Sequence, residues 1–333
     1  GAHGPDDHRE RSQWGSLGIR AEALKRLYDD LIVASGAAYA LGTNLVAVEA
    51  TGRRIDHVVC WGKSGLFGVK AKAYVDATGD GDLCAWAGAS YEQGDADGGM
   101  MPGTLCSLWA DVDWAAVRAD GRYAQNVVPQ AIADGVIEVD DPHLPGMWRI
   151  GAHLGGGNIG HTFGVDNTDE RSVTDALIYG RRLLGQYERF YKQYLRGYEQ
   201  MELAATGSLL GVRETRHFKG LYTITPEDIV EAKVFDDWIA TRNHFNFDIH
   251  NVTGHGLDKD GAQAHFRAKG KYTIPYRSCV PEKIDNLLLA GRCISGTHKA
   301  HSNYRVMQIC LNMGHGVGVA AAVAIKDNVL PRN

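Results

Sequence analysis

Two segments of this sequence place glycine directly after a short apolar run, and they constrain the fold more than any other feature. The first is YVDATGDGD at 74–82, and the second begins with NLLLAGR at 286. Each apolar run is typical of a buried strand, and the glycines that follow permit positive φ angles and a close approach of backbone to a ligand. In open α/β sheets, ligands bind at the carboxyl ends of strands. The sequence therefore predicts an α/β protein with ligand-binding turns at these two strand ends.

The composition limits the class of protein. The 333 residues are 44% hydrophobic and 23% charged, which predicts a folded globular chain. A net charge of −5 argues against a general nucleic-acid binder, and because no window approaches 18 uninterrupted apolar residues we expect no membrane span. Six cysteines without a CxxC pair indicate free thiols in a reducing compartment. No signal-peptide pattern is visible, so we predict a cytoplasmic protein, although a cleaved signal would leave no trace.

The order of predicted elements indicates an α/β domain interrupted by a second domain. We expect residues 1–90 and 281–333 to form the first domain and residues 91–280 an α+β substrate domain. The expected elements are a helix at 17–35 stopped by Gly36, an antiparallel meander of short strands from AAYALG at 37 to 77, a helix-like LCAWAGA at 83–89, helices at 169–198 and 226–239, a strand at 284–291 and a helix at 303–327.

Several motifs occur together in one order along the chain. AGRCIS at 290–295 is followed by His298 and by a helix beginning near RVM at 305–307. Upstream stand GVRETRHFKGLYTITPEDI at 211–229, DIHN at 248–251 and YTIPYRSCVP at 272–281. Together these segments resemble the FAD-dependent oxidoreductases. The resemblance implies an FAD/NAD(P)-binding, glutathione-reductase-like domain and FAD as cofactor. It also implies oxidation of a C–OH or C–N bond of a small molecule by hydride transfer to flavin N5.

The same resemblance implies a set of cofactor-binding residues. The backbone of one strand would meet the adenine, the turn after 76 would approach the adenosine diphosphate, the turn after 290 would follow the ribityl and pyrophosphate, and a helix N-terminus would face the N1–C2=O edge. These residues are Leu45 and Val46, then Ala77, Thr78, Gly79 and Asp80, then Gly291 and Arg292, then Val306 and Met307. Without the resemblance, residues 77–80 would be an ordinary strand-to-helix turn with Asp80 or Asp82 as N-cap, and Leu45 a core residue of the meander.

One expected motif of this family is missing. Members begin with a strand, GxGxxG and a helix that hold the FAD pyrophosphate. The only literal match is Gly155, Gly157 and Gly160, followed by the β-like HTFGV instead of a helix, which favours a turn of the substrate domain. We therefore expect the first βαβ unit to come from a second chain, to be removed by processing, or to be absent from this chain.

Histidines are the best candidates for the base, because oxidation of C–OH or C–N requires one and a neutral imidazole suits it. The resemblance singles out His298 and His250, with Arg305 or Arg213 holding an anionic or polar substrate group. A hydrogen-bonded structural histidine and a salt-bridged Arg305 are the alternatives, and Arg213, Glu214 and Arg216 also fit an ion-pair network between domains. His301 and Asn303 depart from the apolar or small residues usual in the family, which suggests a link to this substrate.

Two other functions stay open at this point. The chain could be a non-catalytic subunit that completes a flavoprotein partner. Fourteen histidines could instead ligate the metal of a hydrolase, with His298 and His301 three apart and His250, His255 and His265 within one segment. No HExxH or other recognised spacing occurs, so we predict no metal.

Overall fold

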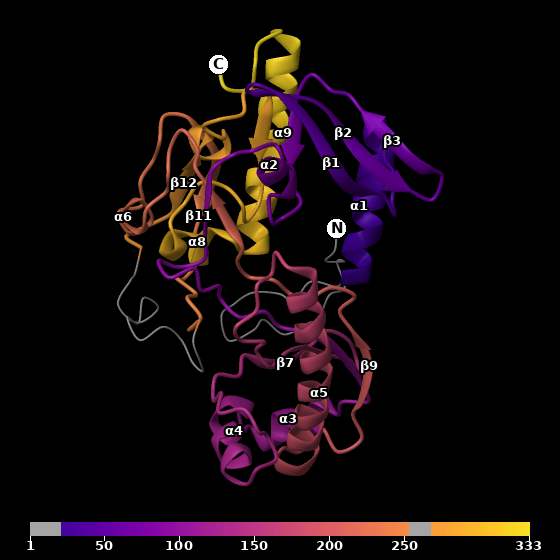
Figure 1. Ribbon diagram of the computed structural model, residues 1–333. Coiled ribbons are helices and arrows are strands. Elements are labelled where there is room, and N and C mark those ends of the chain that lie inside the picture. The colour runs from indigo at the N-terminus through magenta and orange to yellow at the C-terminus, as the bar shows by residue number, and fades with distance from the viewer. Residues whose placement is uncertain (1–20, 253–267) are drawn as a thin grey trace.

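The computed structural model describes residues 21–252 and 268–333, which form two lobes, one above the other in Figure 1. The upper lobe holds both the N-terminal and the C-terminal elements, and the lower lobe holds the middle of the chain. Each lobe has its own hydrophobic core, one formed mainly from residues 55–89 and 218–317 and the other from residues 105–210. The domain limits predicted from the sequence stay a prediction.

A parallel pair of strands lies at the centre of the upper lobe. β4 (Tyr74–Asp76) pairs with β13 (Leu287–Leu289) in register, with Leu287 opposite Tyr74 and Leu289 opposite Asp76. Because parallel strands end at the same edge, the two glycine-bearing turns that follow them lie side by side. Among the strands of the described residues, β4 is paired on this one side alone.

The predicted helix is present at the N-terminal end, but the antiparallel meander predicted from 37 to 77 is present only in part, because its last strand, β4, pairs in parallel with β13. α1 (Ala21–Ser35) ends before Gly36, whose φ is +70°. β1 (Asn44–Thr51), β2 (Arg54–Gly62) and β3 (Gly65–Val69) form an antiparallel sheet in that order. The run AAYALG at 37–42, predicted as the first strand, forms none. The helix-like LCAWAGA corresponds to α2 (Asp82–Trp86).

The lower lobe packs helices on a four-stranded antiparallel sheet. The sheet order is β7 (Gly146–Arg149), β8 (Gly155–Asn158), β6 (Ser107–Ala110) and β9 (Glu202–Thr206). The predicted long helix is α5 (Glu170–Tyr194), capped by the Asp169 side chain, and α3 (Trp114–Asp120) and α4 (Ala124–Ala133) complete the lobe.

The glycine triplet was predicted as a turn, but most of it lies in the strand β8. A Cβ on Gly157 would stand 2.6 Å from the Ser107 Oγ of the neighbouring strand, so close packing explains this glycine. Only Gly160, with φ +80°, adopts a turn conformation. The triplet is therefore not a phosphate-binding loop.

The helix predicted at 226–239 is much shorter. α6 (Pro226–Val230) begins with a capping box between Thr225 and Asp228 and stops because Ala232 has φ +52°. The chain then enters β11 (Trp238–Asn243), which pairs with β12 (Tyr272–Pro275). The 3-10 turn η1 (Tyr276–Cys279) follows β12, and β5 (Tyr91–Gln93) pairs with β10 (Arg216–Phe218).

The single helix predicted at 303–327 is two helices. α8 (His298–Tyr304) is capped by the Thr297 side chain, and α9 (Met307–Lys326) starts anew after Val306, whose ψ of 149° is extended. The break creates the N-terminus of a 20-residue helix, and this helix contacts the turn after β13 through Met313, whose Sδ lies 3.2 Å from Gly291 N.

α9 is apolar and only partly covered. Among the described residues it is the one helix long and apolar enough to cross a membrane by length and composition, with mean hydropathy 1.4 and 22% of the segment buried. This is weak evidence for a span, because the core helix of a soluble protein passes the same test. In the structure, α9 packs on β11, where Gly316 lies against Ile239.

This contact gives a first prediction. A Cβ at position 316 would stand 2.2 Å from the Ile239 carbonyl oxygen, so Gly316→Ala forces the helix and strand apart and should lower the unfolding free energy by about 1–3 kcal/mol. Gly314 has open space around its Cβ position, so Gly314→Ala should raise it by up to about 1 kcal/mol. Urea unfolding of both variants measures the difference, and equal stabilities would contradict this packing.

Candidate active site

The two glycine-bearing turns are joined by side chains. Arg292 Nη2, after β13, lies 2.9 Å from Asp80 Oδ1, after β4. Asp80 Oδ1 also accepts a hydrogen bond from Thr215 Oγ1 at 3.0 Å, and its carbonyl accepts one from Arg216 at 3.0 Å. The structure thus brings three separated motifs of the sequence to the carboxyl edge of the parallel strands.

The turn at 77–80 is held in place by a buried carboxylate that the sequence did not single out. Asp76 Oδ1 accepts hydrogen bonds from the Thr78 N–H and hydroxyl at 3.0 and 2.8 Å, and Oδ2 accepts one from Cys84 N–H at 2.8 Å. Neither Asp80 nor Asp82 caps α2, because the N-cap residue is Gly81 without a side-chain bond. The alternative of a plain aspartate-capped turn is therefore wrong.

These turns fit a phosphate-bearing cofactor such as FAD. Arg292 Nη1 is buried and has no hydrogen-bond partner among residues 21–252 and 268–333, so a donor is available for an anion. Gly79 and Gly291 have φ angles of +87° and +100°, and a Cβ on Gly291 would meet nothing within 4 Å. Glycine at these positions leaves the backbone accessible to a ligand.

The other predicted cofactor residues belong to elements of the upper lobe. Leu45 and Val46 belong to β1, which contacts α2, and Leu45 packs on the upper core while Val46 is exposed. Val306 and Met307 form the start of α9, where unpaired N–H groups favour negative charge.

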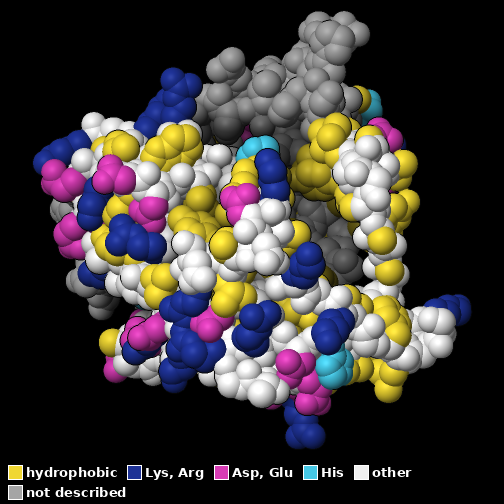
Figure 2. Space-filling model, turned by 90° about the horizontal axis from the view of Figure 1, so that it is seen from above, with side chains coloured by type: hydrophobic (Ala, Val, Ile, Leu, Met, Phe, Trp, Pro, Cys, Tyr) yellow, Lys and Arg dark blue, Asp and Glu magenta, His cyan; other side chains and the backbone are white. Residues whose placement is uncertain are grey.

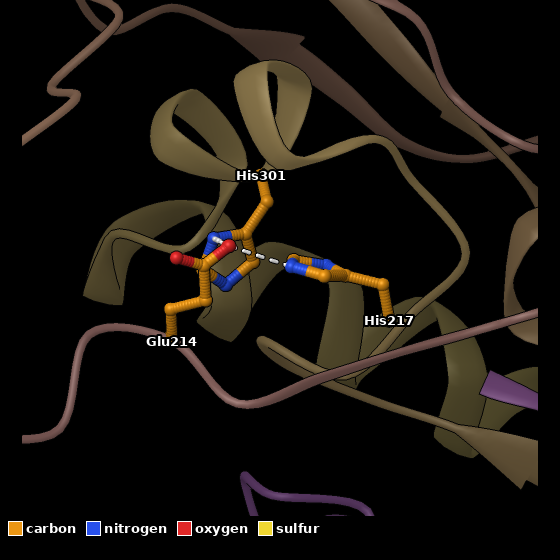
Figure 3. Close-up of side chains that lie close together, drawn as sticks. All are labelled: Glu214, His217 and His301. Atoms are coloured by element: carbon orange, nitrogen blue, oxygen red, sulfur yellow. Dashed lines mark hydrogen bonds and ion pairs between the residues drawn. The ribbon is translucent and has the colours of Figure 1, made fainter. Parts of the chain in front are cut away.

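A buried glutamate organises the histidines around the site. Glu214 is 0% exposed, and its Oε1 lies 2.6 Å from His298 Nδ1 and 2.7 Å from His217 Nε2 (Figure 3 shows the latter). Its Oε2 accepts a hydrogen bond from Met101 N–H at 3.0 Å. Burial alone would raise the pKa of Glu214, but the bonds from His217 and His298 hold it well below its usual range. Glu214 is therefore an anion that fixes the orientation of His298.

A second carboxylate holds His250 and Arg305. Asp248 Oδ2 lies 3.3 Å from His250 Nε2 and 2.7 Å from Arg305 Nη2. Burial opposes ionisation of Asp248, but His250 and the guanidinium of Arg305 keep its pKa below the usual range. Burial lowers the pKa of His250 to about 3, so this imidazole is neutral near pH 7.

Arg213 is bound to the backbone of the lower lobe. Its Nη1 donates to the Pro102 carbonyl at 2.7 Å and lies 2.9 Å from Thr104 Oγ1. Burial, with Arg305 nearby, lowers the pKa of Arg213 to about 10, so the guanidinium stays charged near pH 7. Of the predicted ion-pair network between domains, Arg216 forms an ion pair with Asp82 and Glu214 contacts histidines, while the network itself stays a prediction.

A cavity of about 370 Å³ lies where the two carboxylate–imidazole sets meet. His298 and His250 both line it, so the structure brings the two predicted base candidates together. The His298 side chain is 17% exposed and that of His250 is 2% exposed. The other described lining residues are Asp95, Ala96, Pro226, Ile249, Asn251, Val252, Thr297 and Lys299.

A buried imidazole cluster from the lower lobe reaches His250, and sequence reasoning missed it. His161 Nδ1 lies 2.6 Å from Asp141 Oδ2, with both side chains fully buried. The ring of His161 is 4.9 Å from that of His250 and stacks on His143 at 5.7 Å. His255 and His265, which we considered as metal ligands, lie outside the described residues.

The two residues that depart from the family pattern have different surroundings. Asn303 accepts a hydrogen bond from the Tyr272 hydroxyl at 2.7 Å and donates to the Phe245 carbonyl, so it ties α8 to the core. His301 is buried, with Nδ1 4.0 Å from Glu214 Oε1, and burial holds its pKa well below the usual range. Asn303 is structural, whereas His301 adjoins the site.

Comparisons with known proteins identify the family. Solved structures with low similarity include a geranylgeranyl bacteriochlorophyll reductase-like protein from Thermoplasma acidophilum, 11% identical with a TM-score of 0.45 and covering 98% of this chain and 61% of that chain. A p-nitrophenol 4-monooxygenase from Pseudomonas putida is 9% identical with a TM-score of 0.42, covering 93% and 55%. This chain thus spans less than two thirds of either protein. No curated protein sequence matches it significantly. The profile of the FAD dependent oxidoreductases matches residues 2–333, so the chain belongs to this FAD-using family.

Proposed function

We propose that this chain oxidises a C–OH or C–N bond of a small molecule, with His298 as the base that takes the heteroatom proton. The observation that carries the proposal is the short bond between His298 Nδ1 and the buried Glu214 at the wall of the cavity. FAD, when bound, supplies the acceptor at N5 for the hydride that leaves the substrate carbon.

The pairing of His298 with Glu214 suits a base. A carboxylate at Nδ1 fixes the tautomer and the ring orientation, so Nε2 is the nitrogen that takes the proton. The negative charge of Glu214 then stabilises the imidazolium that forms. Since Glu214 stays ionised, it performs this role without changing its own protonation state.

His250 is less suited to the same role. Its Nε2 faces Asp248, and its Nδ1 is buried with no partner in the described part of the chain, so neither nitrogen is exposed to the cavity as the His298 ring is. A base whose pKa is about 3 is also a weak proton acceptor near pH 7. We assign His250 to the cavity wall. Arg305 would hold Asp248 or a polar group of the substrate, and Arg213 would add positive charge near Arg305.

For the cofactor, the proposal uses the residues around the two joined turns. Ala77, Thr78, Gly79 and Asp80 would approach the adenosine diphosphate, Gly291 and Arg292 the pyrophosphate and ribityl chain, and Leu45 and Val46 the adenine. Val306 and Met307 would present the start of α9 to the N1–C2=O edge, where hydride arrival leaves negative charge that a helix N-terminus stabilises by about 0.3–2 kcal/mol.

We further propose that a βαβ unit carrying GxGxxG docks on the upper lobe beside β4, completing a glutathione-reductase-like flavin domain around the interrupting lower lobe. β4 offers the edge for another parallel strand, and exposed apolar side chains lie on α1, β1–β3 and α9, among them Leu31, Leu66, Leu311 and Val319. Figure 2, which looks down on the upper lobe, shows hydrophobic side chains exposed on this face.

Absorption spectra and intact masses of the purified flavoprotein test both parts. We expect flavin bands near 375 and 450 nm, about one FAD per chain, and a polypeptide carrying GxGxxG in the same complex or chain. FAD bound tightly by residues 1–333 alone would overturn the docking proposal, and a second copy of this chain bound beside β4 would do the same. Absence of flavin from the complete assembly would overturn the proposed FAD-dependent oxidation.

A further inference from the structure

Three buried side chains behind the base candidate form a cluster with the composition of a metal site. Glu214, His217 and His301 each offer one ligand atom, and these atoms all lie within 4.8 Å of one another. Figure 3 shows the three groups converging, with Glu214 from the segment that leads into β10, His217 from β10 itself and His301 from α8. Of the three residues, only His301 belongs to the set of histidines that the sequence suggested for a metal hydrolase.

One of the two distances between these ligand atoms is shorter, and the other is longer, than the distance between ligand atoms around a bound ion. Bonds of about 2.0–2.1 Å in a tetrahedral sphere place neighbouring ligand atoms about 3.3 Å apart. Glu214 Oε1 is 2.7 Å from His217 Nε2 and 4.0 Å from His301 Nδ1. A shift of His217 away from Glu214 and of His301 toward it, each by about 0.7 Å, would bring both distances to about 3.3 Å.

One ligand atom has no other explanation in the described structure. His301 Nδ1 is buried without a hydrogen-bond partner although it points toward Glu214. Buried polar atoms are normally satisfied, and a cation between His301 and Glu214 would satisfy this one. Glu214 supplies the negative charge that a divalent ion requires, and the two imidazoles supply nitrogen ligands.

We propose that Glu214, His217 and His301 bind a divalent transition-metal ion of the Zn²⁺, Co²⁺ or Fe²⁺ class. One carboxylate oxygen and two imidazole nitrogens are the donor set that these ions prefer, whereas Mg²⁺ and Ca²⁺ prefer oxygen alone. His217 would bind through Nε2 in its Nδ1–H tautomer. Because His298 bonds to the same Glu214 oxygen, the ion would lie one hydrogen bond behind the proposed base and would join the β10 segment to α8.

Metal analysis tests this inference without flavin or substrate, so its outcome is separate from that of the proposed function. The protein purified without chelator should contain about one ion per chain by mass spectrometry of its metals. After stripping, titration with Co²⁺ should produce visible ligand-field bands and saturate at one equivalent. His301→Ala and His217→Ala should weaken Co²⁺ binding at least about tenfold.

The matched control is His315→Ala, because His315 is an exposed histidine on α9 away from the cluster. This variant should bind Co²⁺ as tightly as the unaltered protein. Binding that is equally weakened by His315→Ala, or a wild-type protein that holds no stoichiometric metal and gives no Co²⁺ bands, would overturn the inference. The wild-type titration decides the question even if the buried-histidine variants fail to fold.

Discussion

His298→Ala is expected to slow reduction of the bound flavin by about 10²–10⁴-fold while leaving flavin content unchanged. The loss arises because the imidazole that takes the substrate proton would be missing, and Glu214 would have no imidazolium to stabilise. Stopped-flow absorbance at the flavin band, with a panel of alcohols and amines as substrates, measures the rate. Added imidazole should restore part of it, which a merely structural histidine would not allow.

His250→Ala provides the comparison. Its ring lines the same cavity but is almost fully buried, so we expect less than about tenfold loss of rate and a change mainly in KM. Equal rates in His298→Ala and the unaltered enzyme would eliminate His298 as base. A larger loss in His250→Ala than in His298→Ala would transfer the role to His250.

Gly79→Ala is expected to lower the affinity for FAD by at least about tenfold. The new Cβ would stand 2.6 Å from Arg292 Nη2, which displaces the guanidinium from Asp80 and from the place where we put the pyrophosphate. Flavin fluorescence titration of the complete flavoprotein measures this affinity.

Gly88→Ala is a closely matched control for this prediction. Gly88 has φ +85°, like the +87° of Gly79, but nothing lies within 4 Å of its Cβ position. Both variants should therefore pay a similar backbone strain of about 1–2 kcal/mol, and only Gly79→Ala should lose cofactor. Equal FAD affinities would show that the turn after β4 does not approach the cofactor.

Short-range patterns in the sequence predicted many of the local elements correctly. Apolar runs followed by glycine gave β4 and β13, and Gly36 marked the end of α1. The helix at 226–239 was wrong because periodicity does not reveal that Ala232 takes a positive φ. The prediction of one continuous helix at 303–327 was wrong, because the residues Tyr304–Met307 include no glycine or proline that would indicate the extended conformation of Val306.

The site was predictable where one motif carries it and unpredictable where distant residues meet. His298 and His250 were singled out and do line one cavity, but Glu214 was read only as part of an ion-pair network. The spacing of Glu214 and His217 in ETRH could have suggested a carboxylate–imidazole pair. Asp141 and His161 could not, because their contact with His250 depends on how the two lobes pack.

Because of the break between α8 and α9, one short stretch of backbone carries both the proposed base and the helix N-terminus that we propose to face the cofactor. His298 stands at the first position of α8, and Met307 opens α9 nine residues later, with Val306 between the helices. A single inserted residue within α8 would rotate everything on one side of it by about 100° and advance it by about 1.5 Å. In the proposed enzyme, the length of this stretch would therefore set the spacing between the proton acceptor at His298 and the helix end at Met307 that faces the cofactor.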